Sequence, residues 1–173
     1  MPDKVMIRPS TPDDLPAIEQ LYSVAFPEED LLELVRALIA ETAPTLSLVA
    51  ISDGTLAGHS VFTICGLEEN KSLVGLLGPL AVAPDLQRRG IGTALVRDGL
   101  ARLRVDGVAP VCVLGDPAYY GRLGFSAEEH ILPPYALPPE WSGAWQAIGN
   151  LEMPCKGTLR PPDVWMQPAL WQP

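Results

Sequence analysis

The stretch Leu80–Ala101, LAVAPDLQRRGIGTALVRDGLA, decides how the rest of the chain is interpreted. An apolar run ends at Ala83-Pro84, a short polar turn follows, and a helical pattern begins at Gly90. The first N–H groups of a helix lack partners within the helix, and the helix dipole adds partial positive charge there, so such a turn suits an anion. Its glycines let a ligand approach the backbone, and Arg88 and Arg89 add full positive charge. The pattern predicts a turn that holds a pyrophosphate group.

The charge of the chain is acidic overall but basic at this turn. The net charge of −9 argues against a nucleic-acid-binding surface and fits a cationic or neutral substrate. Five of the twelve Lys and Arg residues nevertheless lie between positions 88 and 104. We expect Arg88 and Arg89, at the start of the helix, to contact a ligand. An exposed, solvated helix face explains the three arginines farther along.

Length and composition indicate one compact domain. The chain has 173 residues, of which 47% are hydrophobic and 19% charged. It contains no apolar run near the ~20 residues that a membrane helix needs, and its N-terminus lacks the plan of a secretory signal, so we expect a cytoplasmic protein without membrane contact. Cys65, Cys112 and Cys155 are far apart in apolar surroundings. This favours free buried thiols over a disulfide framework or a metal site.

One strand and two helices are expected near the N-terminus. Residues 4–8 alternate in polarity and predict a first strand. Ser10–Asp14 supplies a hydroxyl cap, a proline and early acids, which predicts a helix that ends near Phe26-Pro27. A second helix is predicted from about Glu28 to Ala40, with Glu28–Asp30 complementing the dipole at its N-terminus.

The central part of the chain predicts a mixed α/β sheet. Residues 46–51 and 55–63 should form a hairpin, because Ser-Asp-Gly separates them. Gly78-Pro79 should bulge or splay a longer strand over 72–82, since proline cannot donate to a ladder. The elements that follow are a helix over 90–105, a buried strand over 111–114 and a short helix over 117–123. A crossover helix should make the two strands that flank it parallel.

The tail, residues 133–173, differs in composition from the rest of the chain. It holds nine of the nineteen prolines and all four tryptophans. We expect late strands over 145–153 and 156–159 within a loop-rich segment. The tryptophans are Trp141, Trp145, Trp165 and Trp171. From sequence, lining a pocket, packing the core and burying a dimer contact all stay open for them.

Two common phosphate-binding motifs do not fit the turn. A Rossmann fingerprint needs G-x-G-x-x-G, and the third glycine position holds Leu95. A P-loop needs Gly-Lys-Ser or Gly-Lys-Thr, which the chain lacks at this turn. What survives is a basic, glycine-containing turn between a kinked strand and a helix, followed farther on by YYGRLGF.

These features together resemble the GCN5-related N-acetyltransferase (GNAT) superfamily. QRRGIG matches its signature Q/R-x-x-G-x-G/A at Gln87, Gly90 and Gly92, and YGRLGF matches its Y-x-x-x-G-F at Tyr120 and Phe125. The chain is similar to a bacterial subgroup with the run LGPLAVAP…GDPAYYGRLGF. The resemblance implies an α/β fold: a mixed, mostly antiparallel central sheet with a splayed parallel pair, flanked by about four helices. It implies a single domain over 1–173, with the signatures in about 4–126 and a Pro/Trp-rich segment over about 127–173.

The resemblance also implies where a donor would bind. In this superfamily the backbone of the turn binds the pyrophosphate of coenzyme A, and the splayed strand binds its pantetheine arm and thioester. The matching turn residues here are Gln87, Arg88, Arg89, Gly90, Ile91, Gly92, Thr93 and Ala94. The matching strand residues are Leu80, Ala81 and Val82. Tyr120 is the implied general acid for the departing thiolate, and the alternative is a core aromatic on a short helix.

The chain departs from the family pattern in two places. Val113 stands where many members carry an asparagine that contacts the pantetheine arm, and Asp116 nearby either substitutes for it or, as we favour, caps the short helix. Residues 73–82 contain no ionisable side chain, so they offer no strand glutamate as general base. The loop Glu28–Asp30, with Glu29 as base or acceptor-site residue, and the strand residue His59 are the alternatives.

The resulting hypothesis is an acetyl-CoA-dependent N-acetyltransferase that acts on a small-molecule or protein amine. No cysteine lies in the signature turn or the tyrosine motif to carry the acetyl group, so we expect direct attack by a primary amine in a ternary complex, without a metal. A homodimer is compatible with the sequence. The alternative function is a non-catalytic acyl-CoA-binding or sensor module, and a more distant one is a nucleotide-binding fold.

Overall fold

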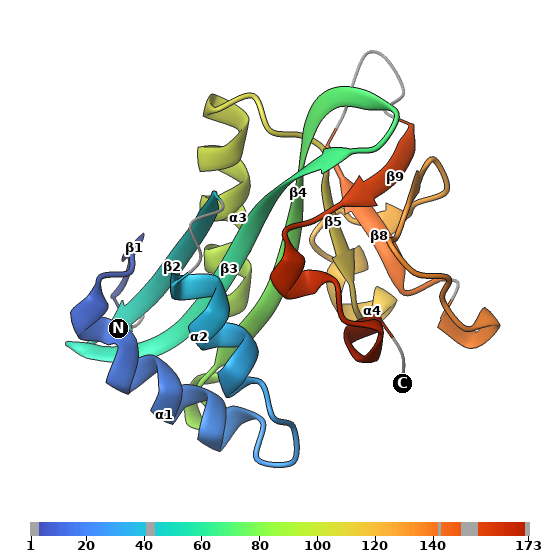
Figure 1. The fold of residues 1–173 in the computed structure, drawn as a ribbon. Coiled ribbons are helices and arrows are strands. Elements are labelled where there is room, and N and C mark those ends of the chain that lie inside the picture. The colour runs from blue at the N-terminus through green and yellow to red at the C-terminus, as the bar shows by residue number, and fades with distance from the viewer. Residues whose placement is uncertain (1–3, 41–43, 142, 150–155, 172–173) are drawn as a thin grey trace. The chain divides into compact units, whose positions relative to one another are not determined.

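The computed structural model describes residues 4–40, 44–141, 143–149 and 156–171. The chain divides into two compact units. The first comprises Met1–Phe62 and Gly78–Arg102, and the second comprises Thr63–Leu77 and Leu103–Pro173. Strands β3 and β4 and helix α3 run through both ranges (Figure 1). Each unit is described by itself.

The first unit pairs its strands in the order β1-β2-β3-β4. Its elements are β1 (Val5–Pro9), α1 (Leu15–Ala25), α2 (Leu32–Ala40), β2 (Thr45–Ser52), the first part of β3 (Thr55–Leu67), the end of β4 (Asn70–Val82) and most of α3 (Ile91–Val105). β1 and β2 are antiparallel, with Val5 opposite Ser52. Asp53 and Gly54, both with positive φ, form the turn between β2 and β3. Two such residues in succession characterise the tight turn that matches strand twist, so the predicted hairpin is confirmed.

The helix starts show one correct and one wrong prediction. A short 3-10 turn over Pro12–Asp14 leads into α1, and the Asp14 carboxylate accepts a hydrogen bond from the Thr11 N–H at 2.7 Å. α2 begins at Leu32, not at Glu28. The Glu29 N–H donates to the Phe26 carbonyl and closes a turn after α1. The acids Glu28–Asp30 therefore lie in a loop before α2, not in its first turn.

Small residues let α3 pack close to the strands of the first unit. A Cβ atom on Gly58 would lie 2.9 Å from Leu95 Cδ1, and one on Gly99 would overlap the ring of Phe62. Successive strand residues face opposite sides of a sheet. Gly58 faces α3 while its neighbour His59 contacts Tyr22 of α1, so α1 and α3 cover opposite faces of this part of the sheet (Figure 1).

The second unit continues the sheet in the order β4-β5-β8-β6. Its further elements are β5 (Val111–Leu114), α4 (Pro117–Gly121), β6 (Ser126–Ala127), β7 (Ile131–Leu132), β8 (Trp145–Ile148) and β9 (Gly157–Arg160). β4 and β5 are parallel, as predicted, with Gly75–Leu77 opposite Val111–Val113. β8 is antiparallel to both β5 and β6, and β9 is antiparallel to β3 but parallel to β7.

Three tryptophans of the tail form the core of the second unit. Trp145 and Trp165 both pack against Trp171, with ring centroids 5.7 and 6.1 Å apart, and all three are buried. Each indole N–H finds an acceptor: Trp145 bonds the Ile131 carbonyl, Trp165 bonds Thr63 Oγ1, and Trp171 bonds the Trp165 carbonyl. Of the alternatives that the sequence left open, core packing applies to these three. Trp141 is only half-buried.

The other predicted helices and strands are present, with shifted bounds. α4 ends at Gly121, two residues early, and β8 ends at Ile148. The rest of the strand predicted over 145–153 reaches residues 150–153, outside the described part of the chain. Cys65 and Cys112 are buried free thiols, and Cys155 lies outside the described residues. The mixed α/β sheet, mostly antiparallel and flanked by helices, is confirmed as the fold class.

Candidate functional site

The turn after β4 is tied to the strands before it becomes helical. The Ala83 N–H donates to the Ala57 carbonyl on β3 at 2.8 Å. The Gln87 side-chain amide donates back to the Val82 carbonyl at 3.2 Å. A 3-10 turn over Pro84–Leu86 fills the interval. Gln87 thus fixes the loop against the end of β4, a contact that the sequence motif does not reveal.

The start of α3 carries the geometry expected of an anion-binding turn. Arg88 and Gly90 have φ of 65° and 83°, and the first helical hydrogen bond runs from the Ala94 N–H to the Gly90 carbonyl. The N–H groups of residues 91–93 precede that bond, so they lie where the helix dipole is positive. Arg88, Arg89 and Gly90 are exposed.

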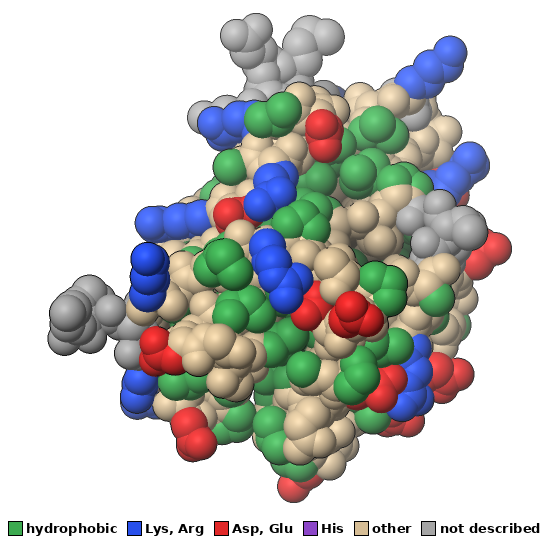
Figure 2. Space-filling view, turned by 90° about the vertical axis from the view of Figure 1, so that its left-hand side faces the viewer, with side chains coloured by type: hydrophobic (Ala, Val, Ile, Leu, Met, Phe, Trp, Pro, Cys, Tyr) green, Lys and Arg blue, Asp and Glu red, His purple; other side chains and the backbone are tan. Residues whose placement is uncertain are grey.

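The more distant arginines lie on the solvated side of α3. Arg97 and Arg104 are exposed, and Arg102 pairs with Asp98 one turn earlier in the helix. Figure 2 shows Lys and Arg side chains interspersed with hydrophobic, acidic and other surface on one face. This arrangement fits the solvated helix face expected for the three later arginines.

The end of β4 joins the turn to the core of the first unit. Ala81 is buried in a cluster with Tyr22 of α1 and Val49 of β2, while Leu80 and Val82 are half-buried. Pro79, just before these residues, has no N–H to donate to a neighbouring strand. The residues that the family pattern assigns to the pantetheine arm therefore directly follow a residue that cannot donate to the ladder.

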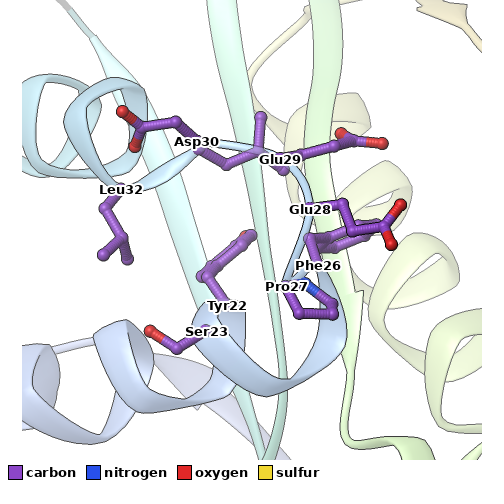
Figure 3. A pocket seen from close by; sticks show the side chains of 9 residues that line it. Tyr22, Ser23, Phe26, Pro27, Glu28, Glu29, Asp30 and Leu32 are labelled. Atoms are coloured by element: carbon purple, nitrogen blue, oxygen red, sulfur yellow. The ribbon is translucent and has the colours of Figure 1, made fainter.

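A pocket of about 330 Å³ lies at the loop between α1 and α2 (Figure 3). The aromatic rings of Tyr22 and Phe26 contribute to its lining, and their centroids stack 6.1 Å apart. Glu28, Glu29 and Asp30 are exposed at the same pocket, with Glu28 and Glu29 on one side of the loop and Asp30 on the other. The pocket therefore combines apolar rings with negative charge, a combination that suits an organic cation.

The aromatic wall of this pocket is anchored by a buried chain of hydrogen bonds. The Tyr22 hydroxyl lies 2.8 Å from His59 Nδ1, and His59 Nε2 lies 2.8 Å from Ser47 Oγ. The Ser10 hydroxyl continues the chain by donating to Ser47 Oγ at 2.7 Å. His59 is fully buried, and burial lowers its pKa to about 4. Both ring nitrogens are engaged, which favours a structural role for His59 over that of a general base.

Tyr120 is fixed in the second unit by its neighbours. Its ring meets Phe125 edge-on at 5.5 Å and Tyr119 at 4.9 Å. Burial, and then the neighbouring Tyr119, raise the pKa of the Tyr120 phenol above its ordinary value of 10.0. A phenol with a raised pKa stays protonated at neutral pH, as a proton donor must.

Asp116 caps α4, in agreement with the interpretation that the sequence favoured. Its Oδ1 accepts a hydrogen bond from the Ala118 N–H at 2.9 Å, and its carbonyl accepts from the Tyr120 N–H. Val113, at the position of the family asparagine, is a buried residue of β5. Asp116 therefore has a local structural function.

Neither a metal cluster nor a membrane helix stands out in the part of the chain that the structure describes. Among those residues, no group of three or more His, Cys, Asp or Glu side chains is placed to hold a metal ion. Over the same ranges, no helix has the length and apolarity needed to cross a bilayer.

The sequence places these features in a known family. The sequence model of the "Acetyltransferase (GNAT) family" matches residues 15–125, a range that holds the loop before α2, the basic turn and Tyr120. The chain belongs to the GNAT family of acetyltransferases. Membership makes it an acetyl-transferring enzyme and confirms the resemblance inferred from QRRGIG and YGRLGF.

Two bacterial GNAT proteins are similar over most of their length. "Uncharacterized N-acetyltransferase YjhQ" of Escherichia coli strain K12 is 33% identical over 159 residues, which cover 87% of this chain and 88% of that protein. "Uncharacterized N-acetyltransferase YhbS" of the same strain is 34% identical over 146 residues, with coverage of 83% and 84%.

Solved GNAT structures share the fold. The structure of YhbS from Escherichia coli in complex with CoA has a TM-score of 0.85 at 27% identity and covers 95% of this chain and 93% of its own. A GNAT acetyltransferase from Brucella melitensis in complex with acetyl-CoA has a TM-score of 0.73 at 33% identity, with coverage of 91% and 96%.

Two features of the site were not anticipated from sequence. The pocket wall formed by Tyr22 and Phe26 was missed, because both residues fit the apolar face of a helix equally well. The contact of Gly115 with the edge of the Tyr120 ring was also missed. For the pocket wall, the available signal was Phe26-Pro27 directly before the acids Glu28–Asp30. For Gly115, it was the position of a glycine directly after a buried strand.

Proposed function

We propose that this GNAT enzyme binds acetyl-CoA and transfers the acetyl group to a primary amine by direct attack in a ternary complex. The observation that carries the proposal is a single core cluster in the first unit. It contains Ala81 of the proposed donor strand and Tyr22 of the pocket, and Phe26 and Ala83 pack against it. The end of the donor strand and the wall of the acidic pocket are therefore parts of one packed structure.

The donor would bind at the end of β4 and the start of α3. Backbone groups of Leu80–Val82 would hold the pantetheine arm, and the N–H groups of residues 88–93 would hold the pyrophosphate. The Ala94 N–H, which belongs to the same predicted turn, already donates to the Gly90 carbonyl. The positive φ of Arg88 and Gly90 turns the backbone at this point. Exposed N–H groups at a helix start bind phosphate well, and Arg88 and Arg89 add charge. The complexes of the two solved relatives with CoA and acetyl-CoA support this choice of donor.

The acceptor would enter the pocket at the α1–α2 loop. Its carboxylates at Glu28–Asp30 attract a protonated amine, and the rings of Tyr22 and Phe26 cover the apolar part of the substrate. Glu29 binds the ammonium group or accepts its proton before attack. Because the carboxylates are exposed, water can carry the proton away in either case.

Tyr120 would complete the reaction as general acid. The neutral amine nitrogen forms a bond to the thioester carbon and releases its remaining surplus proton to water, the C–S bond breaks, and the sulfur leaves as a thiolate. The phenol proton of Tyr120 then passes to that sulfur, and solvent reprotonates the phenolate. We place this reaction in one cytoplasmic acetyltransferase domain that acts on a small-molecule or protein amine without nucleic acid or metal.

Calorimetry and an amine screen test the function. We expect micromolar binding of acetyl-CoA and much weaker binding of ATP and NAD. We also expect acetylation of at least one member of a panel of polyamines, amino-acid derivatives, aminoglycosides and lysine peptides. Micromolar binding of ATP or NAD alone would overturn the donor assignment. Tight binding of acetyl-CoA with no turnover of any amine would favour a non-catalytic acyl-CoA sensor.

A further inference from the structure

Gly115 lies against the Cε2 edge of the Tyr120 ring in the second unit. A Cβ atom built on Gly115 would overlap Tyr120 Cε2 and would lie 3.0 Å from Cδ2 and 3.4 Å from Cζ. The contact between this Cβ and Cε2 would be closer than side chains approach one another in proteins. Either position 115 or the ring of Tyr120 would therefore have to move. The missing side chain at Gly115 thus leaves the space that the ring of Tyr120 occupies.

The backbone of Gly115 is held from both sides. Its N–H donates to the Ala144 carbonyl at 2.9 Å, and its carbonyl accepts from Nε2 of Gln146 at 3.1 Å. Gln146 is 1% exposed, and its amide reaches the Ala144 carbonyl as well, at 3.4 Å. Because the buried side-chain amide of Gln146 donates to both carbonyls, a shift of the loop at Gly115 would break one of its hydrogen bonds.

Two neighbouring aromatic rings also contact the ring of Tyr120. Phe125 and Tyr119 meet it edge-on, and the Phe125 N–H donates to the Tyr120 carbonyl at 3.1 Å. Since these contacts hold the ring of Tyr120 beside Gly115, a methyl group at position 115 would push the ring and its hydroxyl away from their present place. Proton transfer requires the donor oxygen within about 2.6–3.2 Å of its acceptor, so the phenol position matters for the rate.

We propose that Gly115, held in place by Gln146, is a positioning residue for the Tyr120 phenol. The proposal rests on the function assigned to Tyr120 above. Gly115 touches neither donor nor acceptor in this scheme. It acts by setting where the phenol oxygen stands when the thiolate leaves.

The test uses Gly115→Ala, with Gly121→Ala as matched control. Gly121 is the last residue of α4, the short helix that carries Tyr120, and a Cβ there would have no described heavy atom within 4 Å. We expect Gly115→Ala to lower kcat by about tenfold to a hundredfold, the size typical of misplaced catalytic groups, and to leave CoA affinity within about twofold. Gly121→Ala should leave kcat within about twofold of the unmodified protein.

Tyr120→Phe separates positioning from general destabilisation. The phenylalanine ring keeps the contact with position 115 but has no proton to deliver. Gly115→Ala should therefore lower the melting temperature equally in both backgrounds, yet lower kcat only where Tyr120 is present. An equal loss of kcat in the Tyr120→Phe background would overturn the positioning role.

Gln146→Met gives a second route to the same answer. It keeps the length of the side chain and removes the amide that holds the Gly115 carbonyl, so it replaces Gly115→Ala should that variant fail to fold. We expect a several-fold loss of kcat that disappears in the Tyr120→Phe background. If the single variant Tyr120→Phe keeps the full kcat of the unmodified protein, Tyr120 is not the general acid. If Tyr120→Phe lowers kcat but Gly115→Ala and Gln146→Met do not, Tyr120 remains the general acid and the positioning role of Gly115 is wrong.

Discussion

The hydroxyl of Tyr22 and Nδ1 of His59 lie 2.8 Å apart in the core of the first unit. Both side chains are buried, and Tyr22 is also among the residues that line the pocket. The second ring nitrogen of His59 lies within hydrogen-bond distance of Ser47 Oγ. Burial lowers the pKa of His59 from 6.5 to about 4, so the folded protein keeps this imidazole neutral where an unfolded chain would protonate it.

This burial predicts a loss of stability in mild acid. The unfolded chain binds a proton at His59 below pH 6.5 and the folded protein only near pH 4, so the free energy of unfolding falls as pH drops between these values. The shift corresponds to about 3 kcal/mol. His59→Asn, which keeps a hydrogen-bonding group near Tyr22, should flatten this part of the profile. Urea denaturation at pH 4.5–7 measures it, and an unchanged slope in His59→Asn would contradict the assignment.

A separate group controls stability at lower pH. Arg8 binds both oxygens of Asp14, at 2.8 and 2.9 Å, and lowers the pKa of that carboxyl from 3.8 to about 2. The stabilisation from Asp14 is therefore complete above pH 3.8 and is lost as pH falls towards 2. The window above pH 4.5 thus reports on His59 without a contribution from Asp14.

Neutralising Glu29 should weaken acceptor binding more than it slows the reaction. An exposed charge pair contributes about 0.2–1 kcal/mol, so Glu29→Gln should raise KM for a cationic amine by about twofold to fivefold with little change in kcat. Glu33→Gln is the control, since Glu33 is equally exposed on α2 but does not line the pocket. A fall in kcat with an altered pH profile would instead identify Glu29 as the base.

Gly90→Ala should impair donor binding as well as stability. Gly90 has a φ of 83°, and a residue with a side chain pays about 1 kcal/mol or more in that region. Gly107, past the other end of α3, has a φ of 75° and equally open surroundings among the described residues, so Gly107→Ala is the matched control.

Both glycine variants should lose about 1 kcal/mol of stability. Only Gly90→Ala should weaken acetyl-CoA binding, by on the order of tenfold, equivalent to about 1.4 kcal/mol. Isothermal calorimetry on the two variants decides the matter. Equal affinities would indicate that the pyrophosphate does not contact this turn.

Trp171→Ala should destabilise the protein severely. Trp171 is 2% exposed and contacts both Trp145 and Trp165, so its removal leaves a large cavity. Truncations of this kind cost roughly 3–5 kcal/mol. Trp141→Ala, at a half-buried site, should cost much less. Chemical denaturation measures the free energy of unfolding of both variants. Similar decreases would show that packing among the three tryptophans is not the main stabilising interaction of the tail.

Local signals predicted most of the regular elements. The hairpin at Asp53-Gly54 and the strand Val111–Leu114 were found because a tight turn needs positive φ and a buried strand is continuously apolar. The parallel pairing of β4 and β5 followed from the helix between them. Each of these features depends on residues that are close together in the chain, so it can be predicted from the sequence.

A local backbone turn and several tertiary contacts decided what the sequence left open or misplaced. The second helix starts late because the Phe26 carbonyl accepts the Glu29 N–H and closes a turn, a choice that helix propensity does not contain. β6 and β7 have two residues each, too few for any periodic pattern, and exist through their pairing with β8 and β9. The packing of Trp165 depends on Thr63, 102 positions away.

The double use of Tyr22 limits how the acceptor range of this enzyme can be changed by protein engineering. Replacing Tyr22 to widen the pocket would also leave His59 Nδ1 without its hydroxyl partner in a dry core, at a cost of about 1–3 kcal/mol. Phe26 and Glu28 line the same pocket, and Phe26 packs against the edge of the core cluster. Libraries that diversify these two positions and keep Tyr22 should yield more folded variants with altered amine preference.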